Sequence, residues 1–452
     1  MADWILAGDA GLKELYRTLP AAFFQKERWF ADRELQGEIE LVDSIQFHQA
    51  GSTGSVIAFN LYQTQPLMGY YYNLPFLITQ SRNMDREVWF EKSGYYFYDP
   101  IPTYEYISLL EGLIQDRASL PASQGTYRFQ PYRNLYEPRF HLHGSTSNSL
   151  LFVTRGYLLK NYRRIYPGVN PELKIGAALN RLGSKQIPEL YGSFNYQAQR
   201  EYTLGIIMEA VENSGTGWER WGKIFKKPSL ETEELLCEEA SQLGSALGIL
   251  HRDLAIIARN DGAYHDFNLA DFEKRIEHIV NCVRTDQISL PETDSILLKL
   301  TDLKKRLSGS NLGAKYRIHG DLHLEQVIKT ADGWRILDFE GEPLKSIPER
   351  ESYDSPLKDV ASLLRSISYR LNWAEAGHKE IEIKISSSLS QGYLQSCREV
   401  KASFLPGPEE FGPLLTFFQI ERAVYECLYE SKYRPDWLWI PRAGLAKLIQ
   451  SL

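Results

Sequence analysis

Cysteine is scarce in this chain, and its placement excludes two kinds of protein. The 452 residues contain four cysteines, and no two of them form a C-x-x-C pair. A zinc framework or a disulfide-stapled secreted domain needs clustered cysteines, so neither is expected. Reduced thiols in a cytoplasmic protein are the interpretation that fits. The four are far apart in the sequence, at Cys237, Cys282, Cys397 and Cys427.

Long apolar runs and an excess of positive charge are also missing. No apolar stretch approaches the length of a membrane span, and Met1–Trp4 has no basic segment leading into an apolar one. We therefore expect neither a membrane partner nor a signal peptide. The formal net charge is −7, which argues against nucleic acid as a partner, although Lys160–Arg164 forms a local basic patch.

The length of 452 residues is too great for one ordinary core and predicts two or three domains or lobes. The first 211 residues have mainly strand-like patterns. Alternating apolar residues predict strands at Glu38–Val42 and Tyr70–Leu74, after a short helix at Leu12–Leu19. Prolines in Tyr98–Pro102 indicate a joint. Further strands are expected at Leu150–Val153, Tyr157–Leu159 and Leu204–Met208, with a helix at Pro171–Leu182 that Asn170 caps.

After Val211 the apolar spacing becomes helical. Helices are predicted at Glu233–Leu250, Phe267–Val283, Pro356–Leu371 and Ile381–Phe404. One strand-turn-strand island, from Tyr316 to Phe339, interrupts them.

This island carries the residues for phosphoryl transfer. Asp321 and Asp338 lie at its two ends, Gln326 follows Asp321 by five residues, and Gly320 lets the backbone turn before Asp321. One carboxylate can accept the proton of an attacking hydroxyl, while a second carboxylate and an amide oxygen hold Mg²⁺ against nucleotide phosphates. The interpretation is that Asp321 is the catalytic base and that Gln326 and Asp338 are the metal ligands. Either aspartate alone reads better as a turn residue.

Two similar patterns do not fit their chemistry. His251-Arg252-Asp253 matches the H-R-D of protein kinases, but Ala258 stands where that motif needs asparagine, so we read the segment as a helix end. His319-x-Asp321-x-His323 could belong to a metallohydrolase. Nine histidines without a second cluster do not supply the ligands that zinc hydrolysis needs.

The island resembles a known superfamily. H-G-D-x-H-x-x-Q, followed by a strand and D-F-E, is similar to the catalytic core of the aminoglycoside phosphotransferases, and His319–Leu324 and Asp338–Pro343 resemble maltokinases within it. The resemblance implies ATP, Mg²⁺ and phosphorylation of maltose on its anomeric hydroxyl, giving maltose 1-phosphate for α-glucan (glycogen) synthesis. It also implies an association with trehalose synthase. The family usually has glycine where this chain has Glu325.

The pattern and the resemblance together predict an α+β, bilobal, protein-kinase-like fold with an additional N-terminal α+β cap. Glu27–Ala31 resembles the start of that cap. The expected domains are 1–100 for the cap, 101–211 for a mixed-β nucleotide-binding lobe and 212–452 for a helical lobe with the catalytic loop and acceptor site.

In the nucleotide-binding part, Lys160 ends an apolar strand and could reach the phosphates of ATP. The family has an acidic residue where this chain has Lys174, and Glu172 is the available substitute. Ser147 and Asn148 belong to a hydroxyl-rich turn that either binds phosphates or is an ordinary hairpin. Glu209 and Val211 fall in the expected hinge beside adenine.

The acceptor site is expected near the C-terminus. Tyr425 and Tyr429, like Glu426 and Glu430, are four residues apart and share a helix face. Sugar sites combine such charged and aromatic groups, although the same spacing is common in a core. The segment with its R-P-x-W run resembles the maltokinase C-terminus, which implies substrate contacts for Tyr425, Glu426, Tyr429, Glu430, Arg434 and Trp437. His319 and His323 are expected to join them, whereas Asp359 is expected to anchor the catalytic loop.

Two alternatives stay open. A kinase of the same fold could use glucosamine or an aminoglycoside, and an amine acceptor would favour extra carboxylates such as Glu325. A catalytically silent, nucleotide-binding or trehalose-synthase-interacting module is the other. The complete set of Lys160, Asp321, Gln326 and Asp338 speaks against it, and only Lys174 favours it.

Overall fold

The computed structural model describes residues 4–6, 8–32, 34–49, 55–64, 70–133, 140–145, 149–153, 156–226, 229–284, 293–342, 345–373 and 379–451. These residues form two compact units. The first comprises Met1–Ala177 and Pro188–Val211, and the second comprises Ala178–Ile187 and Glu212–Leu452.

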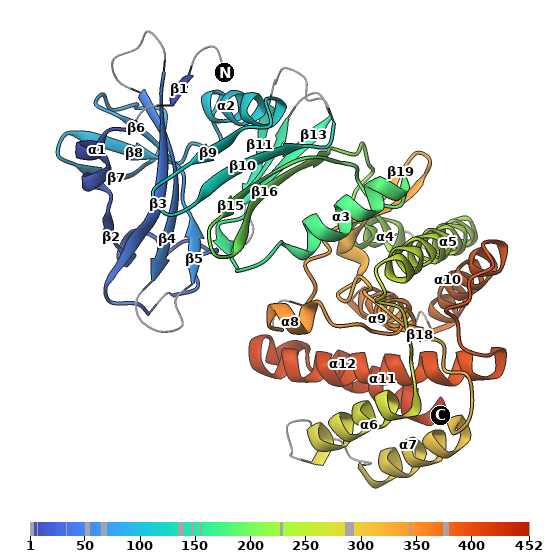
Figure 1. The fold of residues 1–452 in the computed structure, drawn as a ribbon. Coiled ribbons are helices and arrows are strands. Elements are labelled where there is room, and N and C mark those ends of the chain that lie inside the picture. The colour runs from blue at the N-terminus through green and yellow to red at the C-terminus, as the bar shows by residue number, and fades with distance from the viewer. Residues whose placement is uncertain are drawn as a thin grey trace. The chain divides into compact units, whose positions relative to one another are not determined.

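The first unit contains an antiparallel nine-stranded sheet, drawn in blue in Figure 1. The predicted strands at Glu38–Val42 and Tyr70–Leu74 are confirmed within it. The predicted helix Leu12–Leu19 is wrong in its second half: α1 (Ala10–Leu15) ends early, because Thr18–Pro20 pairs with β3 as a strand. The strands are β1 (Trp4–Leu6), β2 (Thr18–Pro20), β3 (Glu38–Gln49), β4 (Ser55–Thr64), β5 (Tyr71–Asn73), β6 (Phe76–Thr79), β7 (Val88–Lys92), β8 (Tyr95–Tyr98) and β14 (Arg164–Ile165).

A seven-stranded antiparallel sheet follows in the same unit, in the order β11-β12-β13-β16-β15-β10-β9. Its two neighbouring central strands β13 and β16 contain the predicted strands Tyr157–Leu159 and Leu204–Met208. Its members are β9 (Ser119–Pro121), β10 (Thr126–Pro131), β11 (Phe140–Ser145), β12 (Ser149–Val153), β13 (Tyr157–Asn161), β15 (Leu190–Gln197) and β16 (Glu201–Glu209).

The two sheets share one hydrophobic core. Helix α2 (Tyr104–Gln115) begins at Thr103, whose hydroxyl caps the Tyr106 N–H, and its apolar face is buried in that core. Phe59 of β4 and Phe194 of β15 belong to the same cluster. The expected boundary at residue 100 falls between β8 and α2, and because the core crosses it, the division into 1–100 and 101–211 stays a prediction.

The second unit is mainly helical. Its helices confirm the predicted helical segments, except that α10 ends at Glu399 rather than continuing to Phe404. Helix α3 (Pro171–Leu182) begins in the first unit and ends in the second. The others are α4 (Gly217–Phe225), α5 (Leu230–Asn260), α6 (Leu269–Arg284), α7 (Thr293–Leu307), α8 (Ile347–Arg350), α9 (Leu357–Trp373), α10 (Lys379–Glu399), α11 (Pro408–Tyr433) and α12 (Trp439–Ser451), and two short 3₁₀ helices are η2 (Leu324–Gln326) and η3 (Pro435–Trp437).

Helices α5 and α10 pack with their backbones unusually close, which glycine permits. A Cβ atom on Gly244 would lie 2.0 Å from the Leu389 carbonyl oxygen, and one on Gly392 would lie 2.1 Å from the Ser241 carbonyl oxygen. A side chain at either position would push the helices apart. Across the described residues, no helix is both long enough and apolar enough to cross a bilayer.

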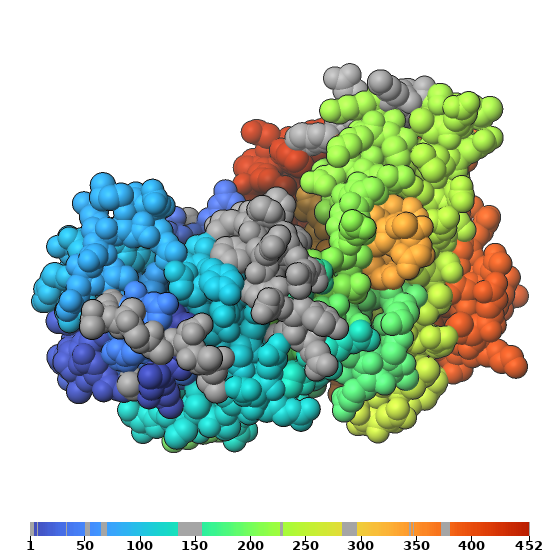
Figure 2. Space-filling model, turned by 90° about the horizontal axis from the view of Figure 1, so that it is seen from above, coloured from blue at the N-terminus to red at the C-terminus, as the bar shows by residue number. Residues whose placement is uncertain are grey.

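The predicted strand-turn-strand island is confirmed as the hairpin β19 (Val327–Thr330) and β20 (Gly333–Ile336). The hairpin packs against α4 and α5, and part of it reaches the surface there (light orange in Figure 2). Trp334 is buried and donates its indole N–H to the Glu239 carbonyl of α5 at 3.0 Å. The segments on either side of this hairpin carry the predicted catalytic residues. The remaining pair, β17 (His265–Asp266) and β18 (Ala314–Lys315), forms a separate two-stranded sheet.

Candidate active site

Asp321 lies in the loop between β18 and η2, just after a left-handed turn. Gly320 has φ of +85°, a conformation that glycine adopts without the cost that a side chain imposes. The loop is held from α9 by Asp359, whose two carboxylate oxygens accept the backbone N–H groups of His319 and Gly320, each at 2.9 Å. The anchoring role expected for Asp359 is confirmed.

Asp359 has a third partner in the protein-kinase-like sequence segment. The ring Nε2 of His251 lies 3.2 Å from Asp359 Oδ2, and its Nδ1 lies 3.0 Å from the Tyr393 hydroxyl. His251 is fully buried inside α5, so it supports the loop from behind and is not exposed for catalysis. The expectation that this segment ends a helix is wrong, because α5 continues to Asn260.

The Asp321 carboxylate faces Arg422 of α11. Both guanidinium Nη atoms approach Asp321 Oδ1, at 3.3 and 3.4 Å. Burial raises the pKa of Asp321 above its ordinary value, although the Arg422 charge acts in the opposite direction. A carboxylate tuned upward in this way is a stronger base than an exposed one. Arg422 belongs to no motif that predicts a role for it, and its signal in the sequence is the i,i+4 spacing to Glu426.

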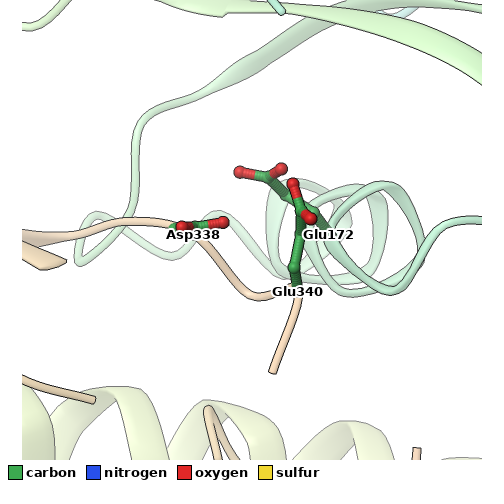
Figure 3. Close-up of side chains that lie close together, drawn as sticks. All are labelled: Glu172, Asp338 and Glu340. Carbon is green, nitrogen blue, oxygen red and sulfur yellow. The ribbon is translucent and has the colours of Figure 1, made fainter. Parts of the chain in front are cut away.

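The two predicted metal ligands lie together. Gln326 Nε2 donates to Asp338 Oδ2 at 3.0 Å, which fixes the orientation of the amide and leaves its oxygen available. Asp338 has φ of +64°, a backbone strain that is rare outside glycine and common at functional sites. A carboxylate beside an amide oxygen is the hard oxygen donor set that Mg²⁺ prefers, so the residues fit the ion. Figure 3 shows Asp338 and Glu340 on the segment that follows β20.

The two histidines that were predicted to contact the substrate differ in their position relative to the cavity described below. His319 is fully buried; its Nε2 contacts the Leu337 carbonyl at 2.8 Å, and it does not line the cavity described below. We therefore replace the expected substrate contact of His319 by a supporting role under the loop. His323 does line the cavity, and burial, followed by the Arg422 charge, lowers its pKa to about 4. Its imidazole is therefore neutral at neutral pH and can donate or accept a hydrogen bond.

A cavity of about 520 Å³ lies within the second unit, and Asp321 is part of its wall. The structure brings all six predicted C-terminal residues to this cavity, although their role in binding stays a prediction. Trp218, Ser362, Ser366, Tyr369 and Arg422 were not among the predicted site residues. The lining is Trp218, Asp321, His323, Glu325, Ser362, Ser366, Tyr369, Arg422, Tyr425, Glu426, Tyr429, Glu430, Arg434 and Trp437.

Aromatic rings and guanidinium groups alternate along one side of the cavity. Tyr425 and Tyr429 stack with ring centroids 6.4 Å apart. The Arg434 guanidinium lies 5.3 Å from the Tyr429 ring and 4.8 Å from the Trp437 ring. Cation–π contacts hold such rings in fixed positions, with flat apolar surfaces suited to sugar C–H groups.

Carboxylates outnumber cations in the lining. Glu426 is paired with Arg365 of α9 at 2.8 Å, and Glu430 Oε1 with Arg434 at 2.8 Å. Glu430 is 2% exposed, and among the described residues its Oε2 has no hydrogen-bond partner. Burial of the carboxylate raises the pKa of Glu430. An unpaired carboxylate oxygen in a cavity wall is a natural contact for a donor group on a ligand.

In the first unit, Lys160 at the end of β13 forms a buried ion pair. Its Nζ lies 2.7 Å from Glu172 Oε2 in the first turn of α3, and Tyr162 donates to the same oxygen at 2.8 Å. Figure 3 shows Glu172 on this helix. Glu172 is therefore the acidic partner of Lys160. Lys174, at the position where an acidic residue was expected, is exposed. The predicted cap is also present, since Asn170 Oδ1 accepts the Glu172 N–H at 2.8 Å.

Of the other residues predicted to contact the nucleotide, the structure describes Glu209 and Val211. Glu209 is the last residue of β16, and its backbone N–H donates to the Glu189 carbonyl at 2.7 Å, so this N–H is already used. Val211 is the last residue of the first unit and is half-buried. Ser147 and Asn148 lie outside the described residues, so their phosphate contacts stay a prediction.

The chain is similar to characterised sugar kinases. Glucosamine kinase from Streptacidiphilus jiangxiensis is 22% identical over 299 residues, which are 63% of this chain and 66% of that protein. The match thus spans slightly less than two thirds of that relative. Glucosamine kinase from Mycolicibacterium smegmatis is 21% identical over 140 residues, 29% of this chain and 34% of that one. No protein-family model matches.

Solved structures extend the similarity over nearly the whole chain. A glucosamine kinase crystal structure (crystal form B) gives a TM-score of 0.73 at 16% identity, covering 97% of this chain and 99% of that one. Glucosamine kinase in complex with glucosamine, ADP and inorganic phosphate gives 0.69 at 16% identity, covering 96% and 98%. The predicted α+β fold is confirmed, and it is the fold of these glucosamine kinase structures.

Proposed function

We propose that this chain transfers the γ-phosphate of ATP to a hydroxyl group of a sugar, with Asp321 as the base. The observation that carries the proposal is that Asp321 lies both in the wall of the cavity and in the loop that leads to Gln326. This arrangement supports Asp321 as the base beside an acceptor cavity and Gln326, in the short helix that follows the loop, as a metal ligand.

The proposed step is an in-line transfer of the γ-phosphoryl group to the acceptor. The acceptor oxygen forms a bond to the γ-phosphorus, the bond between that phosphorus and the β,γ-bridging oxygen breaks, and ADP leaves. The hydroxyl proton goes to the Asp321 carboxylate, whose pKa burial raises. Gln326 and Asp338 would hold Mg²⁺, which neutralises charge on the nucleotide phosphates. Lys160, oriented by Glu172, would bind the phosphates of the nucleotide, with Glu209 and Val211 near its base.

For the acceptor, the charges of the cavity support an amino sugar, with glucosamine first. Four carboxylates, Asp321, Glu325, Glu426 and Glu430, stand against two guanidinium groups in the lining and against three when Arg365, the partner of Glu426, is counted. This excess of negative charge attracts an ammonium group and gives a neutral sugar no equivalent gain. The similarity to glucosamine kinases points the same way. Glucosamine therefore replaces maltose as the first choice.

Maltose is the second candidate acceptor. The motif resemblance favours it, and so do the aromatic rings of Trp218, Tyr425, Tyr429 and Trp437 in the lining, because neutral sugars bind largely through ring faces. The cavity volume of about 520 Å³ lies within the range of roughly 300–1,000 Å³ that is typical of ligand pockets. A role in glycogen synthesis and an association with trehalose synthase belong to this second candidate only.

The test is ATP consumption with Mg²⁺ over a panel of glucosamine, glucose, maltose, trehalose and kanamycin, with the product located by ³¹P NMR. We expect glucosamine to have the highest kcat/KM. Asp321→Asn should abolish turnover while nucleotide still binds, and Asp332→Asn, in the exposed hairpin turn, is the matched control that keeps it. A preference for maltose would transfer the proposal to the second candidate.

Two other outcomes would end parts of the proposal. Full turnover by Asp321→Asn would remove Asp321 as the base. Nucleotide binding without turnover on any acceptor would favour the silent module, although the Lys160–Glu172 pair takes away the feature that supported it.

A further inference from the structure

Arg422 is shared by three carboxylates and tightly bound to none. Its guanidinium lies 3.3 Å from Asp321, 3.6 Å from Glu342 and 3.7 Å from Glu426. A charge-assisted hydrogen bond of this type is normally about 2.7–2.9 Å long. The Arg422 guanidinium therefore lies between these three carboxylates without a short contact to any of them.

Other arginines of the same unit behave differently. Arg275 contacts Glu421, the residue before Arg422, at 2.7 Å through one Nη atom. Arg365 contacts Glu426 through Nε at 3.1 Å and through Nη2 at 2.8 Å. These pairs have the short distances of fixed ion pairs. Of these three arginines, the one that touches the proposed base has the longest contacts.

The two alternative partners of Arg422 are held in place by other cations. Glu342 is 4% exposed, with Lys345 at 2.8 Å and Lys358 at 3.6 Å. Glu426 is held by Arg365. The Tyr425 ring, 5.0 Å from the guanidinium, supports Arg422 from one side. Two anchored carboxylates around one loosely bound guanidinium make Arg422 the element that can move.

Such a movement has a chemical use. A carboxylate that pairs with arginine is a weaker base, because the cation stabilises its charged form. Arg422 contacts Oδ1 of Asp321 through both Nη atoms, so an acceptor hydroxyl that approaches this oxygen must compete with it. Fixed carboxylates within 4 Å give the arginine an alternative at little cost in energy.

We propose that Arg422 moves from Asp321 to Glu342 when the acceptor binds, and that Glu342 is the positioning residue that draws it away. Arg422 then shields the base in the empty site and frees it in the occupied one. This inference rests on the proposed function, because it takes Asp321 as the base. It assigns to Glu342, which does not line the cavity, an effect on turnover that acts through Arg422.

The test is a double-mutant cycle with Glu342→Gln and Arg422→Ala. Glu342→Gln keeps the shape and removes the charge, so Arg422 should stay on Asp321. We expect kcat to fall about tenfold, as for one charge-assisted contact, with the KM for ATP unchanged. In the Arg422→Ala background the same substitution should have no further effect on kcat. Multiplicative losses in the two backgrounds would overturn the inference, because Glu342 would then act independently of Arg422.

A second variant covers the case in which Glu342→Gln does not fold, which thermal melting will detect. Lys345 contacts Glu342, and its side chain is 36% exposed. Lys345→Gln should strengthen the attraction of Glu342 for Arg422 and raise kcat about twofold or more, again without a change in the KM for ATP. A fall in kcat would contradict the inference.

The outcomes are separate from those of the proposed function. If wild type phosphorylates no sugar, or if Asp321→Asn stays active, the proposed function fails. If wild type is active, Asp321→Asn is inactive and the double-mutant cycle shows no coupling, only the movement of Arg422 is refuted.

Discussion

Asp359→Asn is the substitution whose effect follows most directly from the structure. Asp359 is fully buried, and its two oxygens accept from His319, Gly320 and His251. Asparagine keeps the shape but has one acceptor oxygen, so its amide group must face a donor. At least one backbone N–H then loses its partner, and the charge that attracts all three donors is gone.

The expected loss of stability is about 3 kcal/mol. One buried N–H without a partner costs about 1–3 kcal/mol, and weakening the contact with His251 adds to it. That is a large part of the total stability of a typical domain. The turn at Gly320 would also lose its fixed position, and we expect kcat to fall by about a hundredfold, as for a small displacement of a catalytic group.

The pH dependence has a definite sign. Burial alone would raise the pKa of Asp359, but the hydrogen bond and charge of His251 and the Gly320 N–H hold it below its ordinary value of roughly 4. A lowered pKa means stability that is present above that pH and is lost as the pH falls through the folded-state value. The difference in stability between wild type and Asp359→Asn should therefore stay constant near neutral pH and shrink as the pH falls below roughly 4.

The assay is urea denaturation followed by fluorescence and circular dichroism, together with steady-state kinetics. Asp302→Asn, at an exposed position of α7, is the matched control and should change the free energy of unfolding by less than about 0.5 kcal/mol. If Asp359→Asn has the same unfolding midpoint and kcat as wild type, then Asp359 does not anchor the loop and the reasoning is refuted.

Three further predictions concern other parts of the chain. Glu172→Gln should raise the KM for ATP about tenfold in steady-state kinetics, because Lys160 loses its partner, while Lys174→Gln should leave it unchanged. Asp338→Asn should weaken Mg²⁺-dependent nucleotide binding at least about a hundredfold in titration calorimetry, and unchanged binding would remove it as a ligand. Gly244→Ala should lower the free energy of unfolding by about 1–3 kcal/mol, whereas Gly176→Ala, with no neighbouring atom within 4 Å, should not, and equal effects would contradict the close packing of α5 and α10.

Most of the local structure could be predicted from the sequence. Periodicity located the strands and most helices, because burial of one face repeats at the period of the element. It failed where pairing between distant segments decided the outcome, as in Thr18–Pro20, which forms a strand only because β3 lies beside it. The order Gly320, Asp321, Gln326 and Asp338 could be recognised because these residues lie close together in the sequence, on either side of one short hairpin.

Contacts between distant segments were decided by the tertiary structure alone. Arg422 reaches Asp321 across 101 positions, and Asp359 reaches Gly320 across 39. Neither pair can be recognised from a characteristic spacing in the sequence, because contacts over such separations depend on how the helices pack. The partner of Lys160 was decided in the same way. The orientation of α3 turns position 172 towards Lys160 and leaves position 174 exposed. The groups proposed for phosphoryl transfer could be recognised in the sequence, whereas the packing of the helices decided which charges surround them.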